Sequence, residues 1–303
     1  MKGKLKGAWE TIKQSFSEWR EDKAPRLAAA IAFYTIFSLA PLLIIAIAIA
    51  GLVFGEEAAR GQIMGQISGL VGSAGGRAIE DMVAGAGRRG AGILGAIIGV
   101  IILLFGAGGL FDQLQDALNT IWEVKPKPER GIWGVLKDRF LSFGMVLVIG
   151  FLLLVSLVLT TALSALSGFI GGPLGEDSFL FHIVNFVISF GVITLLFALM
   201  FKVLPDAKIA WSDVWLGAAI TALLFEVGKY LLGFYLGRAT VASAYGAAGS
   251  LVVLLLWVYY ASQILLFGAE FTQVYANKYG SGVKPEETAM AVEEKEVPKQ
   301  EAA

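Results

Sequence analysis

Long apolar runs separated by short polar segments set the pattern of this chain. A bilayer hydrocarbon core of about 30 Å requires roughly 20 consecutive apolar residues in a helix. Several stretches reach that length, and ionisable residues are rare inside them. The pattern predicts an all-α membrane protein, a six-transmembrane-helix bundle, with spans near residues 28–54, 91–111, 140–164, 180–204, 213–236 and 247–275.

The segment before the first span alternates apolar and charged residues with the period of an amphipathic helix. Its apolar residues share one narrow helical stripe, and its charged residues lie off that stripe. This is typical of an N-terminal interfacial amphipathic helix that lies flat on the membrane, with tryptophans at headgroup depth. It is equally typical of an amphipathic helix packed on the protein's own base, and the two interpretations are compatible. The stripe consists of Leu5, Ala8, Trp9, Ile12, Phe16 and Trp19.

Three domains follow from this division of the chain. Residues 1–26 form the cytoplasmic interfacial helix, and residues 27–278 form the six-helix transmembrane domain. Residues 279–303 are rich in Glu, Lys, Pro and Ala, and we expect a disordered cytoplasmic tail because such a composition buries too little apolar surface to fold. No cleavable signal sequence is expected before the first span, because residues 1–26 are polar or amphipathic.

Some shorter features interrupt the spans. Pro41 lies inside the first span and lacks a backbone donor, so we expect a kink there, which neighbouring helices or the Ser38 hydroxyl help to satisfy. Residues 55–90 are too polar and glycine-rich to span, and their apolar positions predict one or two short surface helices. A polar helical extension begins at Asp112 and ends before Pro126.

Composition agrees with a membrane protein and argues against several other classes. The chain is 56% hydrophobic and 16% charged, with a mean hydropathy of +0.71, whereas soluble domains carry about 25% charged residues. A net charge of −1 provides no basic field for nucleic acid. The chain has no cysteine and a single histidine, His182, so we expect no metal site and no cofactor.

Lysine and arginine are distributed unevenly among the segments between spans. They concentrate in the N-terminal segment, the second and fourth loops and the tail, and are few in the other loops. By the positive-inside rule, both termini are predicted to be cytoplasmic. We therefore expect a multi-pass protein of the cytoplasmic (inner) membrane, with the lipid bilayer as its first partner.

Ionisable residues inside the last two spans are the candidate functional residues. Each costs at least about 2.5 to 3.5 kcal/mol at the bilayer centre, so these faces should point at protein or water rather than lipid. They predict a polar lining for a transport path between the two spans. The alternative is a structural Glu226–Lys229 pair, with Glu270 merely near the membrane edge. The candidate residues are Glu226, Lys229, Tyr230, Arg238, Tyr259, Gln263 and Glu270.

Several stretches of the chain resemble the YihY/BrkB family of bacterial inner-membrane proteins, once called ribonuclease BN. These stretches are AAAIAFYTIFSLAPLL, LQDALNTIWEV, LPDAKIAWSDVWLGAAITALLFEVGKYLLGFYL and SAYGAAGSLVVLLLWVYYASQILLFGAEF, and the resemblance as a whole covers roughly residues 10 to 278. The last is the most specific, with Tyr245-Gly246, Trp257, Tyr259-Tyr260, Gln263 and Gly268-Ala269-Glu270. The resemblance implies a six-helix protein of the cytoplasmic membrane, linked in some members to envelope integrity and serum resistance.

Three functions compete for this sequence. The first is a transporter or exporter of an unknown solute or lipid, ion-coupled through Glu226 or Glu270, with Lys229 or Arg238 as counter-charge. The second is a non-transporting envelope scaffold that binds lipid or a partner protein. The third, a nuclease, is disfavoured because only Asp112 and Asp116 form a close acidic pair at a helix start, and we expect no enzyme.

Small-residue faces at Gly92 to Gly99 and Gly233 to Gly237 permit a homo-oligomer and equally permit packing within one chain.

Overall fold

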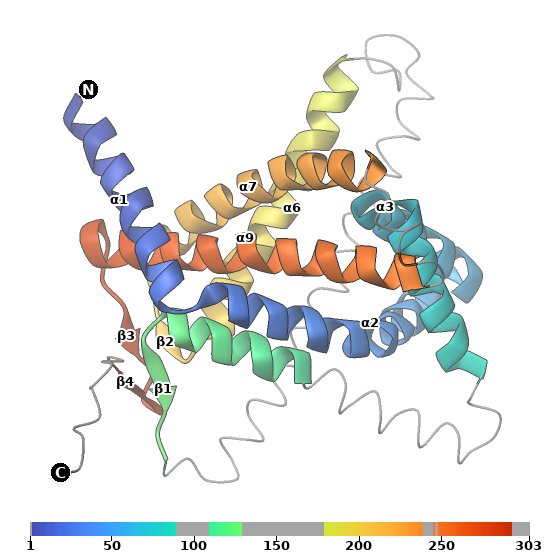
Figure 1. The fold of residues 1–303 in the computed structure, drawn as a ribbon, viewed down its shortest axis with the longest axis horizontal. Coiled ribbons are helices and arrows are strands. Elements are labelled where there is room, and N and C mark those ends of the chain that lie inside the picture. Colours follow the sequence, from blue (N-terminus) through green and yellow to red (C-terminus); the bar gives the residue numbers. More distant parts are fainter. Residues whose placement is uncertain (1, 89–108, 129–178, 239–244, 246–247, 293–303) are drawn as a thin grey trace.

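The computed structural model describes residues 2–88, 109–128, 179–238, 245 and 248–292. The predicted third span, and all of the second except residues 109–111, lie outside these residues. The described elements follow the labels of Figure 1, and residues 109–121 form a further helix. Their bounds are α1 (Lys2–Glu21), α2 (Ala24–Phe54), α3 (Glu56–Arg88), β1 (Val124–Pro126), α6 (Phe179–Val203), β2 (Ala207–Lys208), α7 (Trp211–Arg238), α9 (Gly249–Tyr279), β3 (Lys284–Pro285) and β4 (Ala289–Ala291).

Three of the described helices are long and apolar enough to cross a membrane: Phe186–Val203 in α6, Trp211–Tyr235 in α7 and Gly249–Tyr279 in α9. They coincide with the predicted fourth, fifth and sixth spans. Helix α2 provides a fourth candidate span if its two arms, Ala24–Ala40 and Leu42–Ala48, count as one. These arms meet at Pro41 with a bend of 43°, where the missing backbone donor predicts a kink.

Helix α9 is the central element of the described structure. It packs against α1, α2, α3 and α7, and Figure 1 shows it running between α2 and α7. Helices α7 and α9 interlock through small residues, with Gly217 against Thr272 and Gly268 against Thr221. Because neither glycine carries a Cβ, the two backbones approach closely, as is usual for helix pairs in membranes.

The predicted surface segment after the first span is helical, as expected, but more extensive. Helix α3 is two helical arms joined at Gly72, where φ is 79°. A residue with a side chain rarely adopts this backbone conformation. Ile63 and Val71, each 8% exposed, belong to a hydrophobic cluster that α3 builds with α2 and α9. The segment is therefore packed on the bundle by its apolar side.

Within residues 279–292, the C-terminal segment differs from the disordered tail predicted for residues 279–303, and residues 293–303 lie outside the described residues. Residue 279 ends α9, and two short strands follow within residues 280–292. Strand β3 pairs antiparallel with β2, and β4 pairs antiparallel with β1. Composition misses this order because backbone hydrogen bonds hold the segment, and these need no large apolar side chains.

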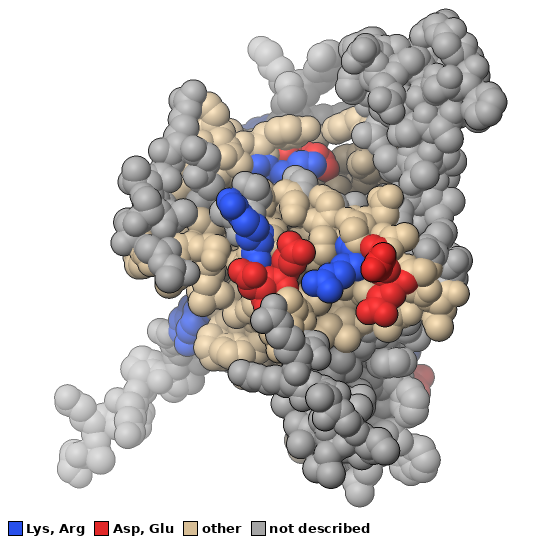
Figure 2. Space-filling view, turned by 90° about the vertical axis from the view of Figure 1, so that its right-hand side faces the viewer, with Lys and Arg blue, Asp and Glu red and all other residues tan. Residues whose placement is uncertain are grey.

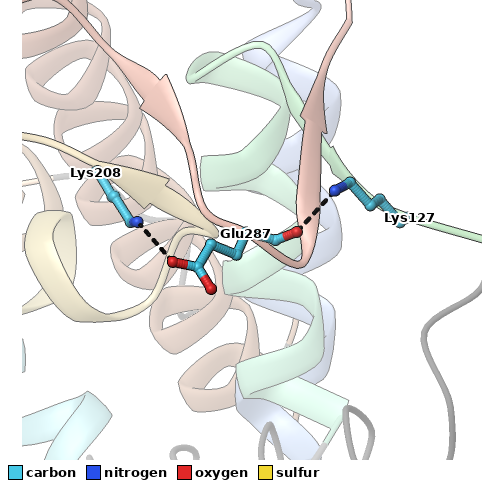
Figure 3. A network of polar contacts seen from close by, with 3 residues as sticks. All are labelled: Lys127, Lys208 and Glu287. Atoms are coloured by element: carbon cyan, nitrogen blue, oxygen red, sulfur yellow. Dashed lines mark hydrogen bonds and ion pairs between the residues drawn. The ribbon is translucent and has the colours of Figure 1, made fainter.

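Polar side chains add to this strand pairing, as Figure 3 shows. The Lys127 ammonium donates to the Glu287 carbonyl oxygen at 2.8 Å. The Glu287 carboxylate lies 3.7 Å from the Lys208 ammonium. Both lysine contacts are exposed, so they contribute at most about 1 kcal/mol each, and the backbone pairing is the main constraint.

Candidate functional site

Glu226 and Lys229 form an ion pair inside α7. The Lys229 Nζ atom lies 2.7 Å from Glu226 Oε2, at the i, i+3 spacing noted in the sequence. Glu226 is 5% exposed, and its second oxygen, Oε1, has no hydrogen-bond partner in the part of the chain that the structure describes. The Lys229 ammonium also lies 5.3 Å from the centre of the Tyr230 ring, which is 70% exposed. The structure thus brings these three predicted residues together.

This ion pair does not face α9. The side of α7 that contacts α9 is marked by Gly217, Thr221 and Gly228. Glu226 precedes Gly228 by two residues, which places it about 160° away around the helix axis at 3.6 residues per turn. The described helices therefore do not form the single polar lining between α7 and α9 that the sequence of these two spans predicts.

Glu270 lies in a different environment, at the junction of α1, α2 and α9. It is 1% exposed, and the Asp22 side chain lies close to its carboxyl group. Glu18 and Glu123 lie close enough to interact with it electrostatically. The Glu270 Oε1 atom is buried without a hydrogen-bond partner among the described residues. The site is therefore a cluster of acidic side chains around a buried carboxyl group.

Burial raises the pKa of Glu18 in this acidic cluster. The hydrogen bond from Gln14 Nε2 to Glu18 Oε1, 2.8 Å long, lowers the pKa in opposition to burial. The neighbouring carboxylates of Glu123 and Glu21 raise it further. The second carboxylate oxygen of Glu18 is buried without a partner among the described residues. The cluster is thus an electrostatically unfavourable place for additional negative charge.

The other predicted residues fall outside both groups. Gln263 is half-buried, and its Oε1 atom is buried without a partner in the described part of the chain. Tyr259 packs against both hydrophobic clusters of the core. Arg238 is the last residue of α7, and its side chain lies outside the described residues.

Sequence reasoning missed Glu18, Asp22 and Glu123 as neighbours of Glu270. They lie at the end of α1, in the turn before α2, and after the helix at 109–121. No periodicity within one helix connects positions so far apart in the chain. Within the described residues, no group of three or more His, Asp or Glu side chains is arranged to hold a metal ion.

Two further buried polar contacts tie the strand-bearing end of the molecule together. Asn119 Nδ2 donates to Asp206 Oδ2 at 3.0 Å, and the Asp206 backbone N–H donates to Asn119 Oδ1 at 2.8 Å. Asp213, near the start of α7, accepts hydrogen bonds from the backbone N–H and the hydroxyl of Ser281, both 3.1 Å long. These carboxylates are structural, because each is occupied by donors from a distant segment.

The fold and these sites define a helical membrane protein with polar groups buried within and beside its spans. The chain belongs to the family described as virulence factor BrkB, whose model matches residues 15–293. This confirms the resemblance to the YihY/BrkB family seen in the sequence.

Curated relatives of the chain carry membrane-protein names. It is 30% identical to a UPF0761 membrane protein of Verminephrobacter eiseniae, over 87% of this chain and 62% of that protein. It is also 30% identical to UPF0761 membrane protein Mpe_A1422 of Methylibium petroleiphilum, over 86% of this chain and 61% of the relative. A UPF0761 membrane protein of Pseudomonas aeruginosa is 29% identical, over 82% of this chain and 58% of its own. The chain thus spans less than two thirds of these relatives' length, and no solved structure matches it.

Proposed function

We propose that this membrane protein is a transporter or exporter that serves the cell envelope from the cytoplasmic membrane. The observation that carries the proposal is the Glu226–Lys229 pair, which lies within an apolar helix and leaves one buried carboxylate oxygen without a partner among the described residues. Ionisable groups are rare and costly within spans and commonly mark solute or ion pathways. Coupling to a proton or cation gradient is the role that such a pair fits.

In this proposal, Glu226 is the exchanging group and Lys229 is its counter-charge. Binding of a proton or cation at Glu226 weakens its attraction to the ammonium, which lies 2.7 Å away in the paired state. The ammonium then becomes available to an anionic substrate group. The buried carboxyl group of Glu270 offers a second exchange position, closer to α1. In this proposal both termini lie in the cytoplasm, which the lysine and arginine distribution supports.

Flux into proteoliposomes tests this function. Purified protein is reconstituted, and the uptake of candidate solutes and labelled lipids is measured with and without a pH or sodium gradient. We expect gradient-dependent flux that Glu226→Gln abolishes and Glu270→Gln reduces. Glu57→Gln, at an exposed position on α3, is the matched control. Absence of flux from folded wild-type protein, or flux that ignores Glu226→Gln, contradicts the proposal.

A scaffold function is the second candidate, and the exposure pattern of α1 favours it. Trp9, Ile12 and Phe16 are 67%, 44% and 51% exposed, whereas Thr11 and Ser15 are almost fully buried. Helix α1 therefore packs on the bundle through its small polar face and leaves these three residues of its apolar stripe outward, whereas Trp19 packs against the core. Such a stripe suits burial in the membrane interface.

Spin labels at positions 12 and 13 distinguish membrane contact from protein contact. If α1 lies in the interface, a label at position 12 is accessible to oxygen dissolved in lipid, and a label at position 13 is accessible to a water-soluble nickel reagent. If both labels are protected from both reagents, α1 contacts a partner protein instead. A scaffold also predicts that deletion of residues 2–22 abolishes function while Glu226→Gln is tolerated.

A further inference from the structure

A cavity of about 750 Å³ lies between the end of α2 and the two arms of α3. This volume is within the range of sites for small ligands. Its walls are mainly apolar and include Ile47 and Leu52 from α2 and Val83 from α3. Two charged residues of the first turns of α3, Glu56 and Arg60, complete the lining. The cavity thus has an apolar body and a charged edge.

The cavity is apolar at one end and charged at the other, as a lipid is apolar in its acyl chains and polar in its headgroup. Most of its apolar wall belongs to the last turns of α2, and its charged edge begins immediately after the turn at Gly55. Leu52 is 88% exposed. A large apolar side chain so exposed is unfavourable in water but suits contact with an acyl chain. We therefore expect the apolar body to hold hydrocarbon and the edge to hold a headgroup.

The charges at the edge select the type of headgroup. Glu56 and Arg60 are four residues apart on α3, so their Cβ atoms are about 5 to 6 Å apart. Neither side chain has an ion-pair partner within the residues that the structure describes, and Arg60 is half-buried. Figure 2, which views the end of the molecule where α3 lies, shows acidic and basic side chains intermixed rather than a patch of one sign.

We propose that this cavity binds a glycerophospholipid with a zwitterionic headgroup that carries a primary ammonium. The Arg60 guanidinium binds the phosphate, for which its fork of donors is suited. The Glu56 carboxylate accepts hydrogen bonds from the ammonium. A choline headgroup has no N–H to donate to Glu56, and a phosphatidylglycerol headgroup has no cation to offset the charge of its phosphate beside Glu56. The site is independent of the proposed transport, because it requires binding only.

Native mass spectrometry of the full-length protein in detergent tests the proposal. Phosphatidylethanolamine, phosphatidylcholine and phosphatidylglycerol are supplied in equal amounts, and the retained lipid is counted. We expect phosphatidylethanolamine to be retained about tenfold over the other two, the ratio expected for one added charge-assisted hydrogen bond. Arg60→Gln should lower its retention about tenfold, and Glu56→Gln should remove the preference over phosphatidylcholine. Glu57→Gln and Arg26→Gln, both at exposed positions outside the cavity, should bind as wild type.

Filling the cavity provides a test that does not depend on charge. Ala84→Phe places a larger side chain on the apolar wall and so narrows the cavity. The variant should retain less phosphatidylethanolamine, and its size-exclusion elution shows whether the protein is folded. Equal retention of the three lipids by wild type overturns the proposal, as does wild-type retention by both charge variants. Free phosphoethanolamine is the last probe. If it competes at the same concentration as the lipid, the acyl chains are irrelevant and the lipid assignment is wrong.

Discussion

At the residue scale, Asn119 and Asp206 show how this protein holds a carboxylate away from water. Each is 5% exposed, and the two exchange a pair of hydrogen bonds across 87 positions of sequence. The Asp206 carbonyl oxygen accepts a third bond from the Glu286 backbone N–H at 2.9 Å. The contact therefore joins the helix at 109–121, the loop before α7 and the C-terminal segment at one point.

Asn119→Ala should destabilise the protein by about 1 to 3 kcal/mol, because it removes two buried hydrogen bonds, one to the Asp206 carboxylate and one from the Asp206 backbone N–H. Unfolding in detergent micelles, followed by circular dichroism against temperature or denaturant, measures the loss. Thr120→Ala is the control, since among the described residues that hydroxyl bonds only to a carbonyl of its own helix, and its loss should change stability by less than about 0.5 kcal/mol. Equal effects of the two substitutions would contradict the assigned role.

Removing one partner of the Glu226–Lys229 ion pair should lower the stability of the protein. Lys229→Met leaves the Glu226 carboxylate buried and unpaired, which typically costs about 3 to 5 kcal/mol. The Lys229 side chain is 22% exposed, so we expect the lower end of that range. The double variant Glu226→Gln/Lys229→Met should be more stable than Lys229→Met, because no unpaired charge remains. Additive effects in this double-mutant cycle would show that the two side chains do not interact.

At the scale of elements, the contact between α7 and α9 depends on two glycine–threonine pairs. A Cβ atom at Gly217 would overlap the Thr272 side chain, and one at Gly268 would overlap the Thr221 side chain. Both threonine hydroxyls donate to a carbonyl of their own helix, so they cannot turn away freely. The two pairs therefore set the separation of these helices.

Gly217→Ala and Gly268→Ala should each destabilise the fold by about 1 to 3 kcal/mol, because the helices must move apart. Gly233→Ala is the matched control on α7, as a Cβ there meets nothing within 4 Å and alanine favours the helix by about 1 kcal/mol. Thermal unfolding in micelles ranks the three variants. Thr272→Ala added to Gly217→Ala should recover part of the loss, and no recovery would point to a different cause.

The docking of α1 should depend on pH through Glu18. Its pKa is raised from a usual value of 4.5 by burial and by Glu123 and Glu21. The docked helix therefore holds the Glu18 proton more tightly than the released helix does. Docking is strongest below pH 4.5, where both forms are protonated, and it weakens as pH rises towards the raised pKa.

Spin labels at positions 13 and 278, both exposed, report the separation of α1 from the end of α9. The population with a long separation should increase with pH in wild type and increase less in Glu18→Gln, which cannot ionise. Gln14→Leu removes the one hydrogen bond that favours the Glu18 carboxylate and should steepen the dependence. An identical pH response in wild type and Glu18→Gln would contradict the role of this carboxyl group.

At the scale of the whole molecule, sequence patterns predicted the elements better than the contacts between them. Apolar length located α6, α7 and α9 because a bilayer imposes a minimum span. The same pattern left the rotation of each helix open, and α7 turns Glu226 away from α9. Glu270 was identified as buried and polar, but its acidic neighbours lie in two distant segments of the chain, at residues 18–22 and at Glu123. Helical periodicity relates positions within one element only.

The C-terminal segment was predicted least well, and it gives the sharpest test of the whole fold. Truncation after residue 280 removes both Ser281 donors from the buried Asp213 carboxylate, together with β3 and β4. Loss of hydrogen bonds to a buried charge costs about 1.5 to 3 kcal/mol, so the melting temperature should fall by several degrees. Truncation after residue 292 keeps every contact described for this segment and should leave the melting temperature unchanged. If both truncations behave alike, the strands contribute nothing to stability, and their order depends on the bundle without supporting it.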